Sequence, residues 1–510
     1  QHTVVGTYQD EPYVSNFSGN VIELCPVGAL TGRQQRFNFR PWELQNRPSI
    51  CPHCAFGCNI NVSVRKNDEV IRFLSRDNPE VDDSWLCDRG RFGSEFINSP
   101  ERLSVPLVRR GDSFVQTSWP MVLDLIAGRL EEIIDLNGPE AISGIASSTL
   151  TNEDLFVFRR FMTDVIGSGH VDHYPRPRLD LSGRQERAMD RLEDALMPIA
   201  GLDESKTILL LGADPSRREP VMELRIRLAV NRHDARLLTL SPDEIPLSSK
   251  SDRSITYSAD RYPEIARGLA AAIRGKTPRL YEGEALSEMA DAFLRDGDVA
   301  VLYDDSFEGV LDKGDALAAT AEVLDALEAH GHAGVIPMLD AANSMGSRNL
   351  SLLPEGRWQA PELERILDPN GGVKAALLLG ANVASDASEP AIAERLRGLD
   401  LLVVSDLMLT PTARLADVIL PAASFAEKIG TFTNTEGRVQ ALSEVVPSPG
   451  LARGEWRMLV DLSQYFDRPL EFNRPEEIWE EIQRAVPAYH DISWADVGLR
   501  GKRSAAAVPV

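Results

Sequence analysis

Four cysteines in the first fifth of the chain have a spacing that could hold an iron–sulfur cluster. They follow the pattern C-x2-C-x3-C-x28-C and are Cys51, Cys54, Cys58 and Cys87; the 510-residue sequence contains only one other cysteine, Cys25. Thiolates two and three residues apart can bind one soft metal centre, with a fourth supplied from further along the chain. The pattern therefore predicts a metal or redox protein, with a [4Fe–4S] cluster as the leading cofactor.

Disulfides and structural zinc are the two competing uses of these cysteines. Five is an odd number and no secretory signal is apparent, which disfavours disulfides. Zinc sites generally combine two C-x2-C pairs, or one such pair with histidines. Here the second half is Cys87 alone, and His53, inside the first pair, has no evident partner. The cluster is therefore favoured over both alternatives.

The segment between the third and fourth cysteines predicts a β-hairpin. Apolar residues alternate over 59–65, a polar turn follows at 66–68, and a second apolar run covers 70–74. Such a hairpin would return the chain so that Cys87 lies beside the other three thiols. Apolar residues flank the motif and would keep water from a cluster: Ile50, Phe56, Trp85, Leu86 and Phe92.

Composition and charge restrict the functional class further. The chain is 43% hydrophobic and 26% charged, as in an ordinary globular protein, and its length predicts about two to four domains. A net charge of −23 argues against nucleic acid as a partner, because phosphates would repel it. No apolar stretch reaches the length of a membrane-spanning helix, so no direct membrane insertion is expected.

The first 30 residues contain a second candidate ligand. Cys25-Pro26, within VIELCPVGALT, is similar to the Cys-Pro ending of a ferredoxin-type cluster motif. The other cysteines of such a motif do not occur before it, and the sequence begins with Gln1. We therefore expect that an upstream region is missing and that Cys25 is a free thiol in this chain. The alternative is that Cys25 is only a buried cysteine.

Downstream of residue 106 the pattern alternates between strands and helices. Helices are predicted over 118–136 and 151–166, and strands are predicted at 141–148, 207–211, 236–240, 299–303, 375–379 and 401–405. Continuous Leu, Val and Ile runs are typical of strands buried on both faces of a parallel sheet. Two segments, 208–229 and 376–398, share an apolar strand, Gly-Ala-Asp/Asn, a Glu-Pro loop and a helix. Neither contains a G-x-G-x-x-G or Walker loop, so no NAD or ATP site is expected.

Several motifs together resemble the molybdopterin oxidoreductase superfamily: CPHCAFGCNINV, WLCDRGRFG, LLLGAN and ADVILPAASFAEKIGTFTNTEGRVQ. One further segment narrows the resemblance to the large iron–sulfur subunit of bacterial NADH–quinone oxidoreductase, complex I; it is FSGNVIELCPVGALTGR. The resemblance implies an α/β fold, in which a small β-rich [4Fe–4S] domain precedes Rossmann-like α/β subdomains.

The same resemblance implies the domain boundaries and the ligands. Residues 1–45 would be the C-terminal remnant of a ferredoxin-like domain, 46–102 the [4Fe–4S] domain, 103–495 a degenerate molybdopterin oxidoreductase α/β domain, and 496–510 a tail. Carried over onto this sequence, the four clustered cysteines would bind the additional cluster found in some bacterial subunits. Cys25 would be the last ligand of a ferredoxin-type cluster.

Departures from the superfamily pattern argue against a molybdenum site. The position of the metal-binding cysteine or selenocysteine corresponds to Arg178 and Leu179, and no cysteine follows Cys87. Asp180 is a conceivable substitute ligand, and Arg89 replaces the lysine that often lies between cluster and pterin. A C-terminal barrel capping the pterin is not evident. No catalytic residue is therefore expected in this chain.

Three polar residues near the end of the motif-rich region would bind pterin in an active relative. They are Asn434, Glu436 and Arg438. With the α/β region interpreted as a scaffold, we expect these side chains to hold loop structure through hydrogen bonds to the backbone.

The resemblance implies an electron-transfer subunit of complex I that contributes to NADH-to-quinone electron transfer coupled to proton translocation. Its partners would be other subunits of the peripheral arm, on the cytoplasmic side of the cell membrane. The alternative is the alpha subunit of a formate dehydrogenase-like molybdopterin oxidoreductase. A third possibility is a non-redox scaffold holding zinc or a purely structural cluster.

Overall fold

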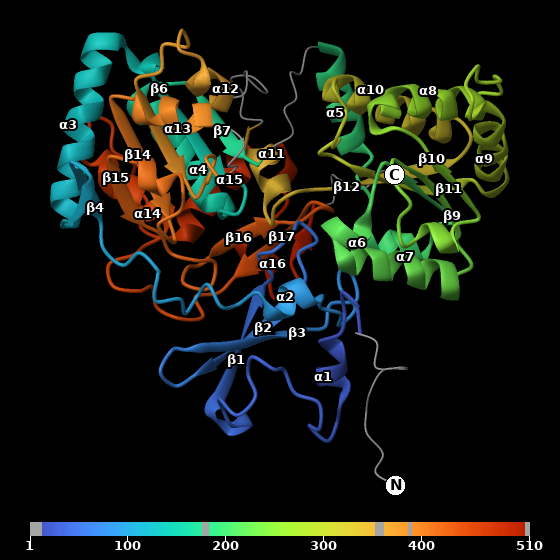
Figure 1. The fold of residues 1–510 in the computed structure, drawn as a ribbon, viewed down its shortest axis with the longest axis horizontal. Helices are drawn as coiled ribbons and strands as arrows, with labels where there is room; N and C mark the ends of the chain where they lie inside the picture. The colour runs from blue at the N-terminus through green and yellow to red at the C-terminus, as the bar shows by residue number, and fades with distance from the viewer. Residues whose placement is uncertain (1–12, 176–182, 352–361, 386–389, 505–510) are drawn as a thin grey trace.

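The computed structural model describes residues 13–175, 183–351, 362–385 and 390–504. A small β-rich domain at one end supports two α/β lobes that lie side by side above it (Figure 1). Within the described residues, the strands form four sheets of three, five, seven and three strands. The predicted α/β fold class, with a small β-rich domain before the α/β region, is confirmed.

The small domain contains the predicted hairpin. β2 (Asn59–Arg65) and β3 (Val70–Ser75) pair antiparallel, and β1 (Leu44–Ile50), which the sequence did not predict, pairs with the other edge of β2. The described N-terminal segment contributes α1 (Asn20–Leu24) and the 3-10 turn η2 (Pro41–Glu43). The short helix α2 (Asp88–Phe92) follows the hairpin.

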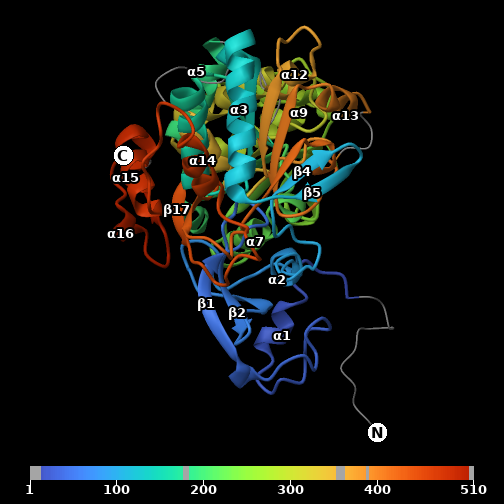
Figure 2. The ribbon, with the colours of Figure 1, turned by 90° about the vertical axis from the view of Figure 1, so that its left-hand side faces the viewer.

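The first α/β lobe is built on a seven-stranded sheet of order β5-β4-β15-β14-β13-β6-β7. Its five strands from β15 to β7 are parallel, and the β4–β5 hairpin adds an antiparallel edge. The strands are β4 (Leu107–Arg110), β5 (Ser113–Gln116), β6 (Ile142–Ser147), β7 (Val171–Tyr174), β13 (Ala375–Leu379), β14 (Leu401–Asp406) and β15 (Val418–Pro421). Helix α3 (Trp119–Asn137) runs along the outside of this sheet (Figures 1 and 2).

Other helices cover this lobe on its remaining sides. They are α4 (Asn152–Arg160), the π-helical turn η4 (Phe161–Ile166), α11 (Ser344–Ser351), α12 (Glu362–Leu367), α13 (Pro390–Arg397), α14 (Glu455–Ser463), α15 (Pro475–Ala485) and α16 (Trp494–Val497). The helix predicted over 151–166 is therefore present, and its last six residues adopt the wider π geometry. Thr151 caps α4 by accepting a hydrogen bond from the Asp154 N–H.

The second lobe has a five-stranded parallel sheet of order β10-β9-β8-β11-β12. Its strands are β8 (Thr207–Leu211), β9 (Arg236–Ser241), β10 (Arg253–Thr256), β11 (Asp298–Asp304) and β12 (His332–Met338). Its helices are α5 (Gly183–Asp194), α6 (Pro215–Arg218), α7 (Pro220–Arg232), α8 (Tyr262–Ile273), α9 (Gly283–Asp296) and α10 (Lys313–Glu328).

The two similar sequence segments lie in different lobes. β8 and β13 begin and end where the sequence predicted, and each is fully buried with a parallel neighbour on both sides. Burial on both faces explains why these strands are continuous apolar runs. The internal similarity therefore reflects two separate α/β units, one for each sheet.

The fourth sheet is small and lies between the lobes and above the hairpin domain (Figure 1). It consists of β16 (Gly430–Thr433), β17 (Arg438–Leu442) and β18 (Lys502–Arg503), all antiparallel. β18 corrects the predicted tail over 496–510, because Lys502 and Arg503 pair with β17 and Arg503 Nε donates to the Glu436 carbonyl at 2.8 Å. The basic pair is thus part of the sheet, and residues 505–510 lie outside the described residues.

Buried ion pairs fix the segment that leads into β16. Arg102, in the linker after the small domain, bonds both carboxylate oxygens of Glu427 at 2.7 and 2.8 Å, with both side chains buried. Lys428 Nζ lies 2.6 Å from Asp154 and 2.7 Å from Glu455. Because a buried charge is stable only when paired, these contacts fix where the chain enters the small sheet.

None of the described helices is both long and apolar enough to span a membrane.

Candidate metal centre

The structure brings Cys51, Cys54, Cys58 and Cys87 together in one buried region of the small domain. Their exposed fractions are 3, 6, 3 and 4%, and none of them forms a disulfide. The first three lie in the loop between the adjacent strands β1 and β2, and this loop is closed by a 2.9 Å bond from the Cys51 N–H to the Cys58 carbonyl. Cys87 is the N-cap of α2, and its sulfur accepts a hydrogen bond from the Gly90 N–H at 3.4 Å.

Gly90 favours the close approach of α2 to the loop. A Cβ at this position would lie 2.8 Å from Leu86 Cδ1 and 3.2 Å from Cys51 Sγ. The absence of a side chain therefore lets the helix that begins at Cys87 pack directly against the loop that starts at Cys51.

The four thiols share one apolar core and one electrostatic environment. Burial raises the pKa of Cys54 to about 12 and the pKa values of Cys51 and Cys58 well above their usual range, and neighbouring cysteines raise all three further. Thiols this desolvated and this close cannot all ionise unless a bound cation balances their charge. A metal centre supplies that balance, so the four thiols fit a site that binds a metal centre.

A [4Fe–4S] cluster and a single metal ion place different demands on four thiols. In a [4Fe–4S] cluster each thiolate binds a different iron, so the four sulfurs surround a larger object than one ion. Among the described residues, no three His, Cys, Asp or Glu side chains form a group that could hold one metal ion.

The turn between β16 and β17 holds the cysteine loop in place. Three donors on this segment bond the carbonyls of residues 55–57: Asn434 Nδ2 at 3.2 Å, the Thr435 N–H at 2.8 Å and Gln440 Nε2 at 2.8 Å. Gly57 has φ +73°, and a Cβ there would lie 2.2 Å from Gln440 Oε1. The path of the cysteine loop therefore depends on Gly57, which adopts the left-handed conformation, and on the hydrogen bonds from the β16–β17 turn.

Asn434, Glu436 and Arg438 hold the turn, and Asn434 and Glu436 do so through hydrogen bonds to backbone groups, as predicted. Asn434 Oδ1 accepts the N–H groups of Glu436 and Arg438 at 3.2 and 2.9 Å. Glu436 accepts the Ile199 N–H at 2.6 Å and Arg438 Nε at 2.6 Å, while Arg438 also pairs with Glu80 at 2.7 Å. These side chains connect the turn to the second lobe and to the small domain.

Two ionisable residues beside the thiols were not identified as neighbours from the sequence. Arg89 of α2 contacts the Cys54 side chain and donates to the Arg218 carbonyl at 2.6 Å; its charge counteracts the burial that raises the pKa of Cys54. Glu219 is fully buried, accepts the Leu339 N–H at 3.2 Å, and has a pKa that burial raises to about 8. Glu219 belongs to the Glu-Pro loop that the two similar segments share, so the sequence drew attention to it. No nearby sequence feature indicated that it would lie beside Cys54.

The remaining sequence candidates lie elsewhere. Cys25 follows α1 in a partly exposed loop, where hydrogen bonds from backbone amides, first that of Leu30 and then those of residues 27–29, lower the pKa of its thiol. Arg178, Leu179 and Asp180, considered for the molybdenum position, lie outside the described residues.

A cavity of about 390 Å³ opens at the carboxyl ends of β8, β9 and β11, where α/β sheets commonly bind nucleotides. Its lining includes one arginine, Arg217, and five carboxylates, Asp214, Asp243, Glu244, Asp304 and Glu308. An acidic lining of this kind repels phosphate.

Comparison with known families agrees with this geometry. The molybdopterin oxidoreductase model matches residues 102–465, and the model of the molybdopterin oxidoreductase Fe4S4 domain matches residues 44–99. The ferredoxin-like domain of NADH-quinone oxidoreductase subunit 3 matches residues 1–31. The chain belongs to the molybdopterin oxidoreductase family, and its Fe4S4 domain indicates a [4Fe–4S] cluster as cofactor.

Two individual relatives show which members of the family this chain is similar to. The chain is 28% identical to the NADPH-Fe(3+) oxidoreductase subunit alpha of Geobacter sulfurreducens, over 98% of this chain and 64% of that protein. It is 29% identical to an NADH-quinone oxidoreductase subunit of Rhizobium meliloti, over 95% of this chain and 61% of that protein. The chain thus spans less than two thirds of the length of these relatives. The resemblance to the large iron–sulfur subunit of NADH–quinone oxidoreductase is confirmed.

A solved structure shows the same fold. Acetylene hydratase from Pelobacter acetylenicus superimposes with a TM-score of 0.64 at 17% identity, covering 88% of this chain and 73% of that one.

Replacing Asn434 with Ala tests the contact between the turn and the cysteine loop. The variant loses the bond to the Phe56 carbonyl and leaves the N–H groups of Glu436 and Arg438 without their acceptor. We expect the free energy of unfolding, measured by urea denaturation, to fall by about 2–4 kcal/mol. Iron content should fall with it. The exposed Asn370→Ala is the control, and an equal effect of both substitutions would contradict the assigned role.

Proposed function

We propose that this chain is an iron–sulfur electron-transfer subunit of NADH–quinone oxidoreductase, complex I. Cys51, Cys54, Cys58 and Cys87 are its cluster ligands in this proposal. The observation that carries it is the group of four buried thiols in a domain whose sequence matches the Fe4S4 model. The similarity to an NADH-quinone oxidoreductase subunit over 95% of the chain supports the proposal that complex I is the complex to which it belongs.

The residues of this chain bind the cluster, exclude water from it and surround it with fixed charge. A [4Fe–4S] cluster supplies one-electron redox chemistry when bound. Ile50, Phe56 and Leu86 belong to the same buried core as the thiols, and this core continues into the second lobe through Ile208 and Leu210. Arg89 places positive charge beside Cys54, which favours the thiolate. Such surroundings tune the reduction potential of a cluster.

The α/β lobes act as a scaffold without a catalytic molybdenum site in this proposal. The absence of any cysteine after Cys87 and the acidic lining of the cavity at the sheet edge support it. NADH oxidation, quinone reduction and proton translocation are then performed by partner subunits of the peripheral arm and the membrane part. The chain would lie on the cytoplasmic side of the membrane as a peripheral component.

The alternative function is that of an alpha subunit in a formate dehydrogenase-like molybdopterin oxidoreductase. The match of residues 102–465 to the molybdopterin oxidoreductase model favours this alternative, because this region binds pterin in active members of the family. It requires molybdenum in the purified protein, whereas the electron-transfer proposal requires iron and sulfide alone.

Cys25 is proposed as a ligand of a second cluster. Amide N–H groups surround its sulfur, as expected for a thiolate that binds iron. The other four cysteines of the sequence are assigned to the first cluster, so Cys25 is the one ligand of the second cluster that these 510 residues supply.

Substituting Cys54 tests the ligand set. Cys54→Ala should reduce the iron content from about four atoms per chain to less than one and destabilise the hairpin domain, because cluster binding is coupled to folding. Iron and sulfide are measured after anaerobic purification. Cys25→Ala is the matched control and should keep its iron. Unchanged iron in Cys54→Ala would refute the assignment.

Thiol alkylation separates the two kinds of cysteine. In the cluster-loaded chain, iodoacetamide should modify Cys25, because its thiol is partly exposed and has a lowered pKa. The four buried cysteines should react only after the iron is removed with a chelator and the chain is unfolded. Mass spectrometry locates the labels. Protection of Cys25 with labelling of one of the other four would assign the ligands differently.

A further inference from the structure

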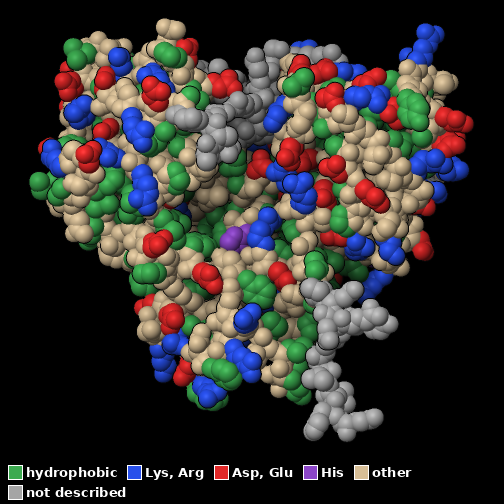
Figure 3. Space-filling model, in the orientation of Figure 1, with side chains coloured by type: hydrophobic (Ala, Val, Ile, Leu, Met, Phe, Trp, Pro, Cys, Tyr) green, Lys and Arg blue, Asp and Glu red, His purple; other side chains and the backbone are tan. Residues whose placement is uncertain are grey.

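Asp82 is a buried acidic residue that contacts both of the segments carrying the cluster ligands. Charged side chains of both signs cover the visible face of the molecule (Figure 3), but the Asp82 side chain is fully buried. Its Oδ2 accepts the Asn59 N–H at 2.7 Å and Asn59 Nδ2 at 3.1 Å, and its Oδ1 accepts the Ser84 N–H at 3.1 Å. Asn59 directly follows Cys58, and Ser84 precedes Cys87 by three positions. One side chain therefore connects the third cysteine of the motif to the fourth.

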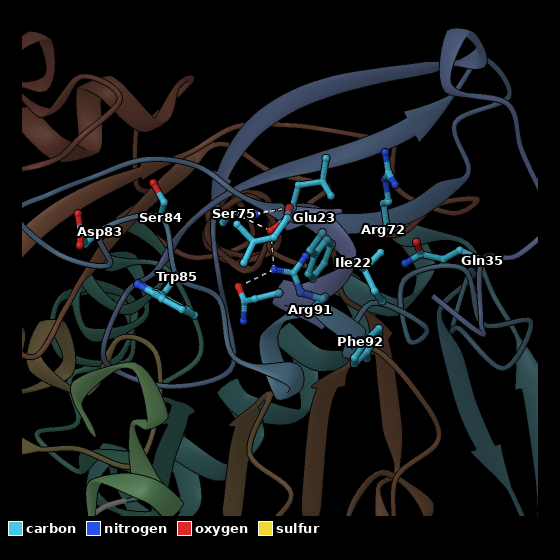
Figure 4. Close-up of a pocket in the computed structure, with 14 residues that line it drawn as sticks. Ile22, Glu23, Gln35, Arg72, Ser75, Asp83, Ser84, Trp85, Arg91 and Phe92 are labelled. Atoms are coloured by element: carbon cyan, nitrogen blue, oxygen red, sulfur yellow. Dashed lines mark hydrogen bonds and ion pairs between the residues drawn. The ribbon is translucent and has the colours of Figure 1, made fainter. Parts of the chain in front are cut away.

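The turn that leads from Asp82 to Cys87 is stabilised by the same carboxylate. Asp83 and Ser84 have φ angles of +46° and +67°, in the left-handed region that residues other than glycine adopt uncommonly. The bond from the Ser84 N–H to Asp82 Oδ1 spans this turn, and the Trp85 N–H donates to the Asp82 carbonyl at 2.8 Å. Asp83, Ser84 and Trp85 line a cavity of about 670 Å³ (Figure 4). The contacts of Asp82 thus set the direction in which the chain approaches Cys87.

The hydrogen bonds to Asp82 favour its ionised form. All of them come from N–H groups of Asn59 and Ser84, which a carboxylate accepts on both oxygens. Burial raises the pKa of Asp82 to about 7, and these bonds together with the charge of Arg76 oppose the rise. Above about pH 8, more than one unit beyond that pKa, the side chain is therefore an anion.

Arg76 does not form an ion pair with Asp82. Its Nη2 donates to Asn59 Oδ1 at 2.9 Å and to the Ser49 carbonyl at 3.2 Å, and its Nε donates to the Ile60 carbonyl at 3.2 Å. The guanidinium group thus holds β1 and β2 together, and the Asp82 charge stays without a contacting counter-ion from Arg76.

The Asp82 charge acts on one particular thiol. Burial is the main cause that raises the pKa of Cys58, Cys51 raises it further, and the Asp82 carboxylate adds to both. Arg89 lies beside Cys54 instead, where its charge opposes the rise that burial causes in that pKa. A buried charge is screened by salt much less than an exposed one, so Asp82 influences the site more than surface carboxylates do.

We propose that Asp82 is a positioning residue for Cys58 and Cys87 and that its negative charge lowers the reduction potential of the cluster. This inference rests on the cluster assignment made above and adds a residue that sets its potential. A one-electron reduction adds one negative charge to the site, and a buried carboxylate next to a ligand makes that added charge less favourable.

Asp82→Asn tests the charge, because the amide has nearly the same shape and no charge. The full chain is purified anaerobically and titrated with dithionite at about pH 8.5, where Asp82 is ionised, and the reduced fraction is measured by electron paramagnetic resonance. At a fixed ambient potential the ratio of reduced to oxidised cluster should be about tenfold higher in the variant, which corresponds to about 59 mV. The matched control is Asp83→Asn, which removes the same charge from the adjacent exposed side chain and should stay within about twofold of the wild type.

Asp82→Ala tests the positioning role. It removes every acceptor for the Asn59 and Ser84 N–H groups, so the rate at which a chelator extracts iron should rise several-fold. Asp82→Asn keeps one acceptor oxygen and should show a smaller rise, whereas Asp83→Asn should extract like the wild type. If Asp82→Ala does not accumulate as folded protein, the comparison between the two Asn variants decides.

Iron content separates this inference from the cluster assignment. An equal or lower ratio of reduced to oxidised cluster in Asp82→Asn, with about four irons in both chains, would overturn the charge role and leave the cluster in place. Equal rates of iron extraction in every folded variant would overturn the positioning role. A wild-type chain without iron would overturn the cluster assignment and this inference with it.

Discussion

The hydrogen bonds between the β16–β17 turn and the cysteine loop are the constraint on which the metal centre depends. They join residues 378 to 383 positions apart and use backbone carbonyls of the loop, so they specify its path. The turn is itself fixed by Glu436 and Arg438, which bond the second lobe and the small domain. Without these contacts the first three thiols would stand on an exposed loop that joins two strands. The lobes therefore contribute to the centre although they contribute no thiol.

Under the proposed electron-transfer function, this dependence gives a physical reason for keeping the two α/β lobes as a scaffold. A cluster bound only by the three-stranded domain would be partly exposed to water. The core that contains the thiols continues into the second lobe through Ile208 and Leu210, which keeps water away and lowers the local dielectric constant. The lobes also bring Glu219 near Cys54, a buried carboxyl that no local sequence pattern would place there. A scaffold that excludes solvent and fixes charge is what an electron-transfer site requires.

Local patterns predicted that the four clustered cysteines come together and where the central strands lie, because both depend on short-range features. The C-x2-C-x3-C spacing is contained within one loop, and β8 and β13 are continuous apolar runs that only a doubly covered sheet explains. β1 was missed because Asn46, Arg47 and Pro48 interrupt any alternation. β18 was missed because two basic residues become a strand only through pairing with β17. Glu219 and Arg89 meet at Cys54 through tertiary packing alone, which a single sequence does not reveal.

Metal and sulfide analysis of the anaerobically purified chain tests the central claim most directly. We predict about four iron and four sulfide per chain, without stoichiometric zinc or molybdenum, and an S = 1/2 electron paramagnetic resonance signal after reduction with dithionite. One zinc per chain without sulfide would contradict the account and leave the four thiols with a structural ion. Stoichiometric molybdenum beside the iron would contradict the interpretation of the lobes as a scaffold.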